Sequence, residues 1–339
     1  MSKQTTFIPT FSLQEAQKAL ENNIKNLNTE GKPTDLYAPI EYIMSLGGKR
    51  MRPLLVLLGY SLYDNEWKNA VASAIVTEVF HNFTLLHDDI MDNAPIRRGQ
   101  PTAHEKWDES TALLSGDLML IKTYQWFQEA VPSDKFPLIL ELFNKCAIGV
   151  CEGQQFDMEF EKRNNVENEV QIQEYLEMIK LKTAVLLGFS LELGAILGGA
   201  KPFEAQQLRE VGILAGIGFQ LHDDILDVYA DPKTFGKRVG GDITENKKTY
   251  LMLTALQKEK ETGNNELQNW INKQEFNEVE KVNAITQIYN NLNIRQLTEQ
   301  KMNEYFEKSY QILENLSVKH DNQKQFLKQF LMQIQERQK

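Results

Sequence analysis

The heptapeptide Leu86–Asp92, Leu-His-Asp-Asp-Ile-Met-Asp, occurs a second time as Leu221–Asp227, Leu-His-Asp-Asp-Ile-Leu-Asp, with a single Met-to-Leu exchange. Both copies follow apolar stretches that predict helix, and the four-residue spacing places the outer two aspartates of each copy on one helical face. Like charges at this spacing destabilise an isolated helix by about 0.2–0.5 kcal/mol. A sequence that carries this repulsion twice predicts a cation that offsets it at each copy.

The ligand type narrows the choice of cation. The two acidic clusters offer oxygen ligands and no cysteine, which favours Mg²⁺, Mn²⁺ or Ca²⁺. Mg²⁺ is usually held by one or two carboxylates, several waters and substrate phosphates. Two Asp-Asp-x-x-Asp motifs could therefore hold one phosphorylated ligand through metal ions. The alternative interpretation, a solvated acidic helix face, is disfavoured because each copy is embedded among apolar residues.

Composition excludes several classes of protein. The chain has 339 residues, of which 42% are apolar, so it can bury a large core. Its net charge of −10 argues against nucleic-acid or anionic-membrane binding. Cys146 and Cys151 lie outside Cys-x-x-Cys spacing and predict reduced thiols in a cytoplasmic protein. We expect no signal peptide and no stable membrane insertion, because even the most apolar stretch, 184–200, is interrupted by Glu192.

Helical periodicity dominates from Ser12 onward and strand-like alternation is nearly absent, which predicts an all-α fold. No Pro/Gly/Ser-rich linker divides the chain, and the candidate site residues run from Lys49 to Lys247. We therefore expect one helical domain, residues 1–339. The chain from about residue 252 onward is rich in Asn, Gln, Lys and Glu, and predicts peripheral helices that carry no chemistry.

Two basic loops flank the first half of the predicted site. Gly47–Pro53, Gly-Gly-Lys-Arg-Met-Arg-Pro, precedes an apolar helix, and Pro53 suits a first helical position, where N–H groups can meet a phosphate. Alone, this loop could simply be solvated. The loop 93–101 follows the first motif and carries Arg97 and Arg98, whose guanidinium groups pair well with phosphate. Together these loops predict a diphosphate ligand.

Further polar residues stand in helices suited to burial. Lys182 lies in a strongly apolar helix, so its ammonium group needs an anionic partner, either a ligand phosphate or a carboxylate. The stretch 151–157 places polar groups on another such helix. His81 stands among apolar neighbours before the first motif, where a lone histidine is more often a core residue. Basic residues also follow the second motif, in 235–242 and 247–249.

These motifs together resemble the trans-isoprenyl diphosphate synthases of the polyprenyl synthetase family, from Gly47 to about Lys248, with a similar helical tail. The resemblance implies a large all-α bundle around a deep central cavity and a homodimer. It also implies that isopentenyl diphosphate is joined to an allylic diphosphate, which is dimethylallyl, geranyl or farnesyl diphosphate. Three Mg²⁺ ions per active site would assist this reaction, and Mn²⁺ could substitute for them.

The resemblance implies a role for each matching residue. The metal ligands would be Asp88, Asp92 and Asp223, supported by the catalytic aspartates Asp89, Asp224 and Asp227. The allylic diphosphate would be held by Arg97, Lys182, Lys237 and Lys247. Isopentenyl diphosphate would be held by Gly48, Lys49, Arg52, His81 and Arg98. The reaction centre, where carbocation charge must be tolerated, would be lined by Gln154, Asp157, Thr183 and Gln220.

One segment departs from the family pattern. The usual Glu-Gly-Lys-x-Thr is present as Glu245–Thr249, Glu-Asn-Lys-Lys-Thr, so the register favours Lys247 but leaves Lys248 possible. In the implied reaction, cations neutralise the departing diphosphate and the isopentenyl double bond attacks the allylic carbocation. The proton is then lost to the released pyrophosphate, so no side-chain nucleophile is required.

Several alternatives differ in features that the sequence can address. A terpene cyclase or head-to-head synthase would not need the Gly47–Pro53 loop for a second diphosphate. A noncatalytic partner subunit or structural helical protein should have degraded aspartate motifs, whereas both are intact. A Mg²⁺-dependent phosphohydrolase would need a water-activating base, and the sequence identifies none.

The resemblance also implies that the growing product extends along this helix toward its N-terminus, so that side chains one turn before the first motif act as a floor that limits product length. Phe83 lies five residues before Asp88, about 7.5 Å along a helix, and Thr84 lies beside it. Phe83 is bulky enough to block, but the small Thr84 and a motif without a two-residue insertion differ from what the resemblance implies for farnesyl-specific members. The resemblance therefore favours geranylgeranyl diphosphate first and farnesyl diphosphate second. The alternatives are a longer-chain polyprenyl product, or that Phe83 is only core packing and that Phe80 or Leu113 forms the floor.

Overall fold

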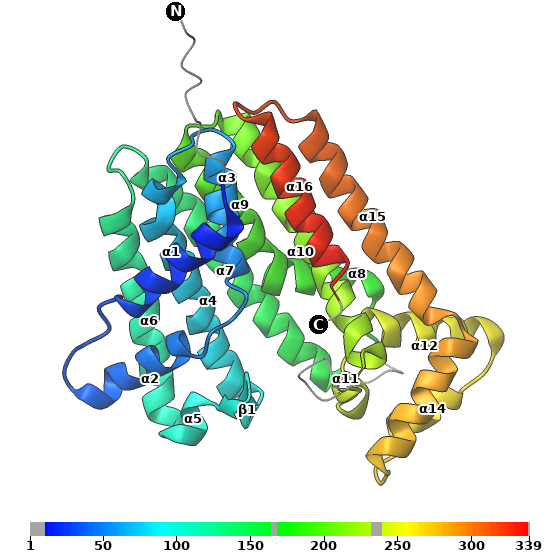
Figure 1. Cartoon of the computed structure of the whole chain (residues 1–339). Coiled ribbons are helices and arrows are strands. Elements are labelled where there is room, and N and C mark those ends of the chain that lie inside the picture. Colours follow the sequence, from blue (N-terminus) through cyan, green and yellow to red (C-terminus); the bar gives the residue numbers. More distant parts are fainter. Residues whose placement is uncertain (1–10, 164–167, 232–238, 338–339) are drawn as a thin grey trace, which may run out of the picture. The chain divides into compact units, whose positions relative to one another are not determined.

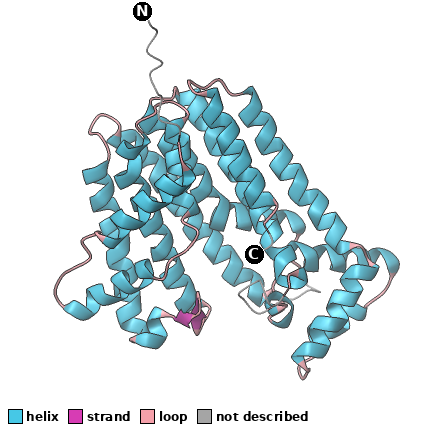
Figure 2. Cartoon of the chain, viewed as in Figure 1, coloured by secondary structure: helices cyan, strands magenta, loops and turns pink. Residues whose placement is uncertain are grey.

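The computed structural model describes residues 11–163, 168–231 and 239–337, and within these it is almost entirely helical (Figure 1). The exception is a short hairpin of two strands, magenta in Figure 2. The all-α prediction is therefore confirmed. In chain order the elements are α1 (Leu13–Lys25), α2 (Thr34–Ser45), α3 (Met51–Ser61), η1 (Trp67–Ala70), α4 (Val71–Met91), β1 (Ile96–Arg97), β2 (Gln100–Pro101), α5 (Ala103–Lys106), α6 (Glu109–Ala130), α7 (Phe136–Lys162), α8 (Ile172–Ile179), the π-helical turn η2 (Lys180–Ala184), α9 (Val185–Gly198), α10 (Pro202–Tyr229), α11 (Gly241–Thr244), α12 (Tyr250–Thr262), α13 (Glu266–Asn272), α14 (Glu278–Asn291), α15 (Ile294–Asn315) and α16 (Asp321–Gln335).

The helices group into two compact units, which we describe separately. The first unit contains the described residues up to Lys145, together with Phe189–Arg209 and Leu316–Gln325. The second contains Cys146–Gly188, Glu210–Asn315 and the described residues from Phe326 onward. Helices α7, α9, α10 and α16 contribute residues to both units. The single domain expected from the sequence stays a prediction.

An aromatic cluster forms part of the core of the first unit. The ring of Phe143 lies 5.0 Å from that of Phe80, 4.9 Å from that of Phe127 and 5.7 Å from that of Phe189. All four side chains are buried. Aromatic pairs at such distances contribute about 0.5–1.5 kcal/mol beyond the area that they bury. The cluster therefore supports α4, which carries the first aspartate motif.

The second unit is built around α10, which carries the second motif. Phe306 of α15 is buried, and its ring is so close to Gly218 of α10 that an added Cβ would lie 2.7 Å from it. Ser309 donates to the carbonyl oxygen of Val211 at 3.1 Å. Helix α15, from the tail of the chain, thus packs directly against α10. That the tail helices are peripheral and carry no chemistry stays a prediction.

The segment Ile172–Gly198, formed by α8, η2 and α9, is long and apolar enough by length and composition to cross a membrane. We had expected no such segment, because Glu192 interrupts its apolar run. In the structure, 78% of its most apolar window is buried inside the protein. Burial explains the apolar composition, because a helix that is apolar on all sides suits the core of a large protein.

Helix α3 begins two residues before the predicted start. Arg50 is its N-cap, with a left-handed φ of 48°, and Met51 is the first helical residue. Pro53 thus occupies the third helical position, where its missing N–H costs no hydrogen bond because the first turn has no intrahelical acceptors.

A buried carboxylate in α9 makes the stability of the first unit depend on pH. Glu192 is 5% exposed, and its Oε2 lies 3.9 Å from Nε of Arg209. Burial raises the pKa of Glu192 to about 7, and the charges of Arg209 and Lys145 offset only part of this shift. Between the usual pKa of 4.5 and about 7, the folded protein keeps a proton that the unfolded chain has lost. Stability therefore falls as pH rises through this window.

Glu192→Gln removes this ionisation, so its free energy of unfolding should exceed that of the wild type by up to about 3 kcal/mol above pH 7. The difference should shrink toward pH 4.5. Urea unfolding at pH 5, 6, 7 and 8 measures it, with Glu210→Gln, an exposed glutamate of α10, as the control. A difference that does not change with pH would contradict the assignment.

Candidate active site

The first aspartate motif lies at the carboxyl end of α4. Asp92 caps the helix, and Asn93 follows with a positive φ of 48°. The N–H of Ala94 donates to the carbonyl oxygen of Asp89 at 2.9 Å, as in the Schellman ending of many helices. Carboxylates at this end add to the negative pole of the helix dipole. The way the helix ends therefore concentrates negative charge at the motif.

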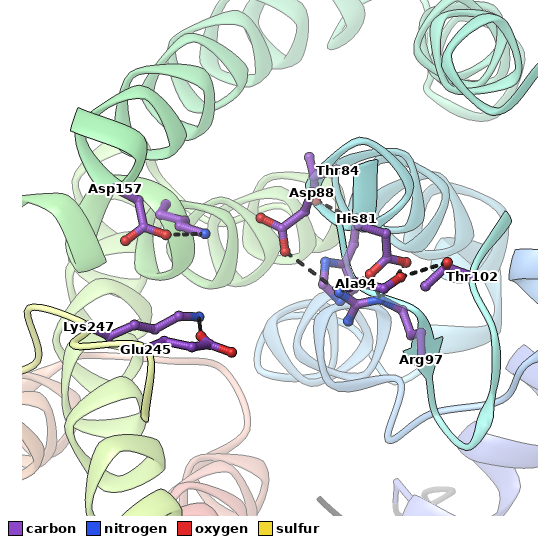
Figure 3. Close-up of polar contacts among 11 residues, drawn as sticks. His81, Thr84, Asp88, Ala94, Arg97, Thr102, Asp157, Glu245 and Lys247 are labelled. Atoms are coloured by element: carbon purple, nitrogen blue, oxygen red, sulfur yellow. Dashed lines mark hydrogen bonds and ion pairs between the residues drawn. The ribbon is translucent and has the colours of Figure 1, made fainter. Parts of the chain in front are cut away.

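Burial separates the three carboxylates. Asp89 is 2% exposed, Asp88 is half-buried and Asp92 is exposed. Arg97 donates from Nε to both oxygens of Asp89, at 2.7 and 2.8 Å, and its Nη2 lies 3.6 Å from Oδ2 of Asp88 (Figure 3). Burial raises the pKa of Asp89, and the hydrogen bonds from Arg97 oppose this shift. Asp89 thus positions Arg97, while Asp88 and Asp92 form the more exposed edge.

A tight hairpin fixes the position of Arg97. Strands β1 and β2 pair so that Arg97 stands opposite Gln100. The turn between them is Arg98–Gly99, with φ of 53° and 75°, and such positive values suit the twist of a two-residue hairpin. Oγ1 of Thr102 donates to the carbonyl oxygen of Ala94 at 2.7 Å, which ties the base of the hairpin to the end of α4 (Figure 3).

The guanidinium group of Arg98 lies against the glycine loop that precedes α3. Its Nη1 donates to the carbonyl oxygen of Gly47. A Cβ added to Gly48 would lie 2.9 Å from Nη2 of Arg98, and the φ of 135° at Gly48 is one that side chains rarely adopt. Lys49 is exposed on this loop, and Arg52 stands in the first turn of α3. The two basic loops that the sequence linked to isopentenyl diphosphate are therefore in contact.

Arg50, between these residues, is used internally. It is buried, and its Nη1 lies 2.7 Å from Oε1 of the buried Glu78. Its Nη2 donates to the carbonyl oxygen of Met44 at 2.8 Å. The pair thus connects the loop to α4, and removing one partner would leave an uncompensated buried charge, at a typical cost of about 3–5 kcal/mol. Sequence reasoning missed Glu78, although a glutamate inside an apolar helical run was a signal for it.

His81 lies within reach of the charges of several arginines. Burial lowers the pKa of His81 well below its usual range, and nearby positive charges lower it further. These charges come from Arg52, Arg98, Arg97 and Arg50. The imidazole is therefore neutral at pH 7, and it can donate or accept a hydrogen bond without adding charge. From the sequence, a lone histidine among apolar neighbours was expected more often to be a core residue. In the structure, the charges of four arginines act on the buried His81.

The proposed chain-length residues sit next to this cluster. Phe83 is buried, with its ring 5.6 Å from that of Phe80 and 4.9 Å from that of His87. Thr84 is half-buried and donates from Oγ1 to the carbonyl oxygen of His81 at 2.8 Å (Figure 3). These contacts agree both with a floor and with simple core packing for Phe83.

In the second unit, the three aspartates of α10 have separate partners. Asp223 is bonded to Arg337, whose guanidinium also lies 4.0 Å over the ring of Phe219. Asp227 accepts from the N–H of Asp242 at 3.1 Å, which holds the start of α11 against α10. No feature of the sequence pointed to Arg337, which stands near the carboxyl end of a Gln-rich helix.

The middle aspartate, Asp224, is turned inward like Asp89. It is 3% exposed and is bonded to the hydroxyl of Tyr175. Burial raises the pKa of Asp224 well above its usual range, and Asp242 adds to this, while the Tyr175 hydrogen bond opposes it. In both copies, therefore, the middle aspartate is held inside the protein. Sequence reasoning did not find Tyr175, because a single tyrosine in an amphipathic helix carries no signal.

The sequence predicted that Lys182 pairs with either a ligand phosphate or a carboxylate, and in the structure it has a carboxylate partner. Its Nζ lies 2.6 Å from Oδ2 of Asp157 on α7, and Figure 3 shows the bond. Lys182 belongs to the π-helical turn η2, and such turns are frequent at functional sites. A Cβ on Gly153 of α7 would lie 2.2 Å from the backbone nitrogen of Lys182, so only glycine permits this approach. Nε2 of Gln154 is buried and has no hydrogen-bond partner among the described residues.

The departure at Glu245–Thr249 has a structural explanation. Asn246 adopts a φ of 57°, and asparagine tolerates this left-handed conformation better than most residues other than glycine. Nζ of Lys247 lies 3.5 Å from Oε2 of Glu245 (Figure 3), whereas Lys248 donates to the carbonyl oxygen of Asn246 at 3.4 Å. Burial lowers the pKa of Lys248. Lys237, the remaining predicted ligand, lies outside the described residues.

The donor set fits Mg²⁺ bound together with a diphosphate. In the described part of the chain, no three His, Cys, Asp or Glu side chains are grouped closely enough to form a metal cage. Mg²⁺ does not require one, because it keeps several waters and shares phosphate oxygens with its substrate. The outer aspartates of each motif supply the one or two carboxylates that this mode of binding needs.

Comparison with known proteins agrees with this chemistry. The polyprenyl synthetase family model matches residues 33–289. A geranylgeranyl diphosphate synthase of Methanosarcina mazei is 39% identical over 229 residues, which are 67% of this chain and 69% of that protein. A farnesyl diphosphate synthase of Bacillus subtilis is 36% identical over 258 residues, which are 73% of this chain and 85% of that protein.

The fold is similar to that of a solved structure of the same kind. The crystal structure of a geranylgeranyl pyrophosphate synthase superposes with a TM-score of 0.90 and 41% sequence identity. The match covers 97% of this chain and 100% of the other. A family model that spans most of the chain and a relative this similar establish the family: the chain belongs to the polyprenyl synthetases.

Proposed function

We propose that this protein condenses isopentenyl diphosphate with an allylic diphosphate and releases mainly geranylgeranyl diphosphate, with farnesyl diphosphate second. The chain is a short-chain prenyltransferase, as its relatives named geranylgeranyl and farnesyl diphosphate synthases indicate. A longer-chain synthase and a noncatalytic partner subunit are not favoured. The observation that carries the proposal is that the two arginine-bearing loops meet beside the first aspartate motif of a protein with net charge −10. Arg98 is bonded to the carbonyl oxygen of Gly47, and Nη2 of Arg97 lies 3.6 Å from Oδ2 of Asp88.

The proposed cofactor is Mg²⁺, three ions per active site, held by Asp88, Asp92 and Asp223. When bound, the metal ions would neutralise charge that develops on the departing diphosphate. The inward aspartates, Asp89 and Asp224, support the ligands through their protein contacts. We expect Mn²⁺ to substitute.

The chain's own cations divide between two diphosphates. Arg97, Lys182 and Lys247 are proposed to hold the allylic diphosphate, and their carboxylate contacts keep these long side chains oriented before substrate binds. Gly48, Lys49, Arg52, His81 and Arg98 are proposed to hold isopentenyl diphosphate. The contact between Arg98 and the glycine loop supports this second group.

The reaction needs polar groups that tolerate positive charge on the allylic carbon. Thr183 and Gln220 are proposed for this role, with Gln154 and Asp157. Oγ1 of Thr183 lies 3.4 Å from Oε1 of Gln220, so the two groups are neighbours. The amide and hydroxyl oxygens carry partial negative charge and are not nucleophiles strong enough to trap a cation readily.

We propose a homodimer that forms through α6. This helix exposes Leu114, Ile121 and Tyr124 at helical spacing, together with Leu113. Exposed apolar residues grouped on one helical face are typical of a protein interface. A cytoplasmic location is also proposed, which the burial of Ile172–Gly198 supports.

Asp88→Ala tests the metal role. We expect kcat to fall by at least about 10³-fold at saturating Mg²⁺, because transition-state charge loses its main stabilisation. The thermal midpoint should hold or rise, because repulsion at the end of α4 is relieved. Asp223→Ala should lose kcat to the same extent, but its thermal midpoint should fall, because Arg337 loses its carboxylate partner. The exposed Asp134→Ala is the control. Product from isopentenyl and allylic diphosphates at near-wild-type rates in either variant would remove the proposed role.

Arg52→Ala tests the division between the two diphosphates. The KM for isopentenyl diphosphate should rise at least about tenfold, while the KM for the allylic substrate changes little, because a charge-assisted hydrogen bond to one ligand is lost. Arg295→Ala, which removes an exposed arginine of α15, is the control. Equal effects on both KM values would mean that Arg52 is assigned to the wrong substrate.

Phe83→Ala tests the floor. Removing the ring should lengthen the product by at least one isoprene unit, read by chromatography of the dephosphorylated alcohols. Because Phe-to-Ala changes in a core typically cost about 3–5 kcal/mol, Phe83→Leu provides a milder variant that should shift the distribution in the same direction. Phe127→Ala controls for loss of a buried ring. Unchanged products in both Phe83 variants would leave Phe80 or Leu113 as the floor.

A further inference from the structure

Tyr175 of α8 contacts the second aspartate motif although the proposed function gives it no role. Its side chain is buried, and its hydroxyl donates to Oδ2 of Asp224 on α10. A buried carboxyl group needs hydrogen-bond donors, so this hydroxyl helps to fix the position of Asp224. The ring of Tyr175 also lies on the helix that continues directly into η2, where Lys182 and Thr183 are found.

Asp224 links three helices through its two oxygens. Oδ2 accepts from Tyr175 and also from the N–H of Tyr250 at 3.4 Å, the first residue of α12. A carboxylate at this end of α12 is favourable because the helix dipole is positive there. Oδ1 accepts from Nε2 of Gln220, one turn earlier on α10, at 3.5 Å. Asp224 thus accepts hydrogen bonds from three protein donors and connects α8, α10 and α12.

The hydrogen bond to Asp224 sets which way the side-chain amide of Gln220 faces. The NH₂ group of Gln220 faces Asp224, because its Nε2 is the donor to Oδ1 of that carboxyl group. Its carbonyl oxygen is then directed to the other side, where Oγ1 of Thr183 donates to it at 3.4 Å. The series Tyr175, Asp224, Gln220, Thr183 therefore orients one amide dipole.

We infer that Tyr175 is a positioning residue, which acts through Asp224 to aim the carbonyl oxygen of Gln220 at the reacting allylic carbon. This inference rests on the proposed function, because it is for an allylic cation that an oriented carbonyl oxygen matters. Fixed dipoles directed at developing charge lower the barrier without reorganisation at the moment of reaction. Tyr175 itself touches no substrate in this scheme.

The test is Tyr175→Phe, which keeps the ring and removes only the hydroxyl. We expect kcat to fall about 10- to 100-fold, as small misplacements at a reaction centre do, with little change in KM for either diphosphate. The matched control is Tyr289→Phe, because Tyr289 is also buried in the second unit and, among the described residues, its hydroxyl is hydrogen-bonded to the Sδ of Met252, at 3.8 Å, and not to Asp224. This control should keep the wild-type kcat.

A double variant separates positioning from mere support of the fold. If Tyr175 acts through Gln220, then Tyr175→Phe should slow Gln220→Ala by no more than about twofold, because the oriented group is already gone. Full multiplication of the two single effects would overturn the inference, and so would a kcat for Tyr175→Phe within twofold of wild type. An equal loss in Tyr289→Phe would overturn it as well.

The wild-type reaction distinguishes this inference from the proposal on which it rests. Absence of a longer prenyl diphosphate when the wild type is given isopentenyl diphosphate, an allylic diphosphate and Mg²⁺ would overturn the proposed function and the inference together. Product from the wild type with undiminished kcat in Tyr175→Phe would overturn the inference alone.

Discussion

Three carboxylates at the negative end of the apolar helix α4 are the constraint that shapes the first aspartate motif. The dipole of α4, the repulsion between Asp88, Asp89 and Asp92 and the apolar surroundings all disfavour the same ionised groups. The structure meets this cost by turning the middle aspartate inward and giving it strong donors. The outer two aspartates are left at the more exposed edge, where a divalent cation and its waters can reach them.

Both copies of the motif turn the middle aspartate inward, but with different partners. In α10 the outer aspartates are also bonded, Asp223 to Arg337 and Asp227 to the N–H of Asp242. In α4 the donor is the guanidinium group of Arg97, carried by the hairpin that follows the helix. In α10 it is the hydroxyl of Tyr175, assisted by the N–H group that begins α12. A guanidinium group brings a full positive charge to the first motif, whereas the second receives only dipoles at its middle aspartate. The first motif is therefore tied to its neighbouring basic loops, and the second to the helices that carry Lys182 and Gln220.

The basic residues of the first unit also differ in whether an internal partner neutralises them. Arg50 is neutralised by Glu78 inside the first unit, and this pair joins the glycine loop to α4. The remaining cations of that region act on His81, whose pKa falls so far that the ring stays neutral. A neutral histidine among arginines can donate a hydrogen bond from one ring nitrogen to a phosphate oxygen without adding positive charge to the cluster. Its state depends on burial and on the arginines, neither of which local sequence reveals.

The sequence by itself determined the helical class, the repeat of the aspartate motif and the pairing of its outer carboxylates on one face. These features depend on spacing along a helix, which is local and periodic. It also predicted that Lys182 needs an anion, because an unpaired ammonium group in an apolar helix is costly.

Only the tertiary structure decided which partner each charged group has. Asp157 lies 25 residues from Lys182, Tyr175 lies 49 from Asp224 and Arg337 lies 114 from Asp223. Periodicity tells which face of a helix a side chain occupies, but not which other helix packs there. The inward turn of Asp89 and Asp224, the internal use of Arg50 and the neutrality of His81 all follow from such distant contacts. Their physical reason is shared: a buried charge or dipole takes its state from the groups that packing brings beside it.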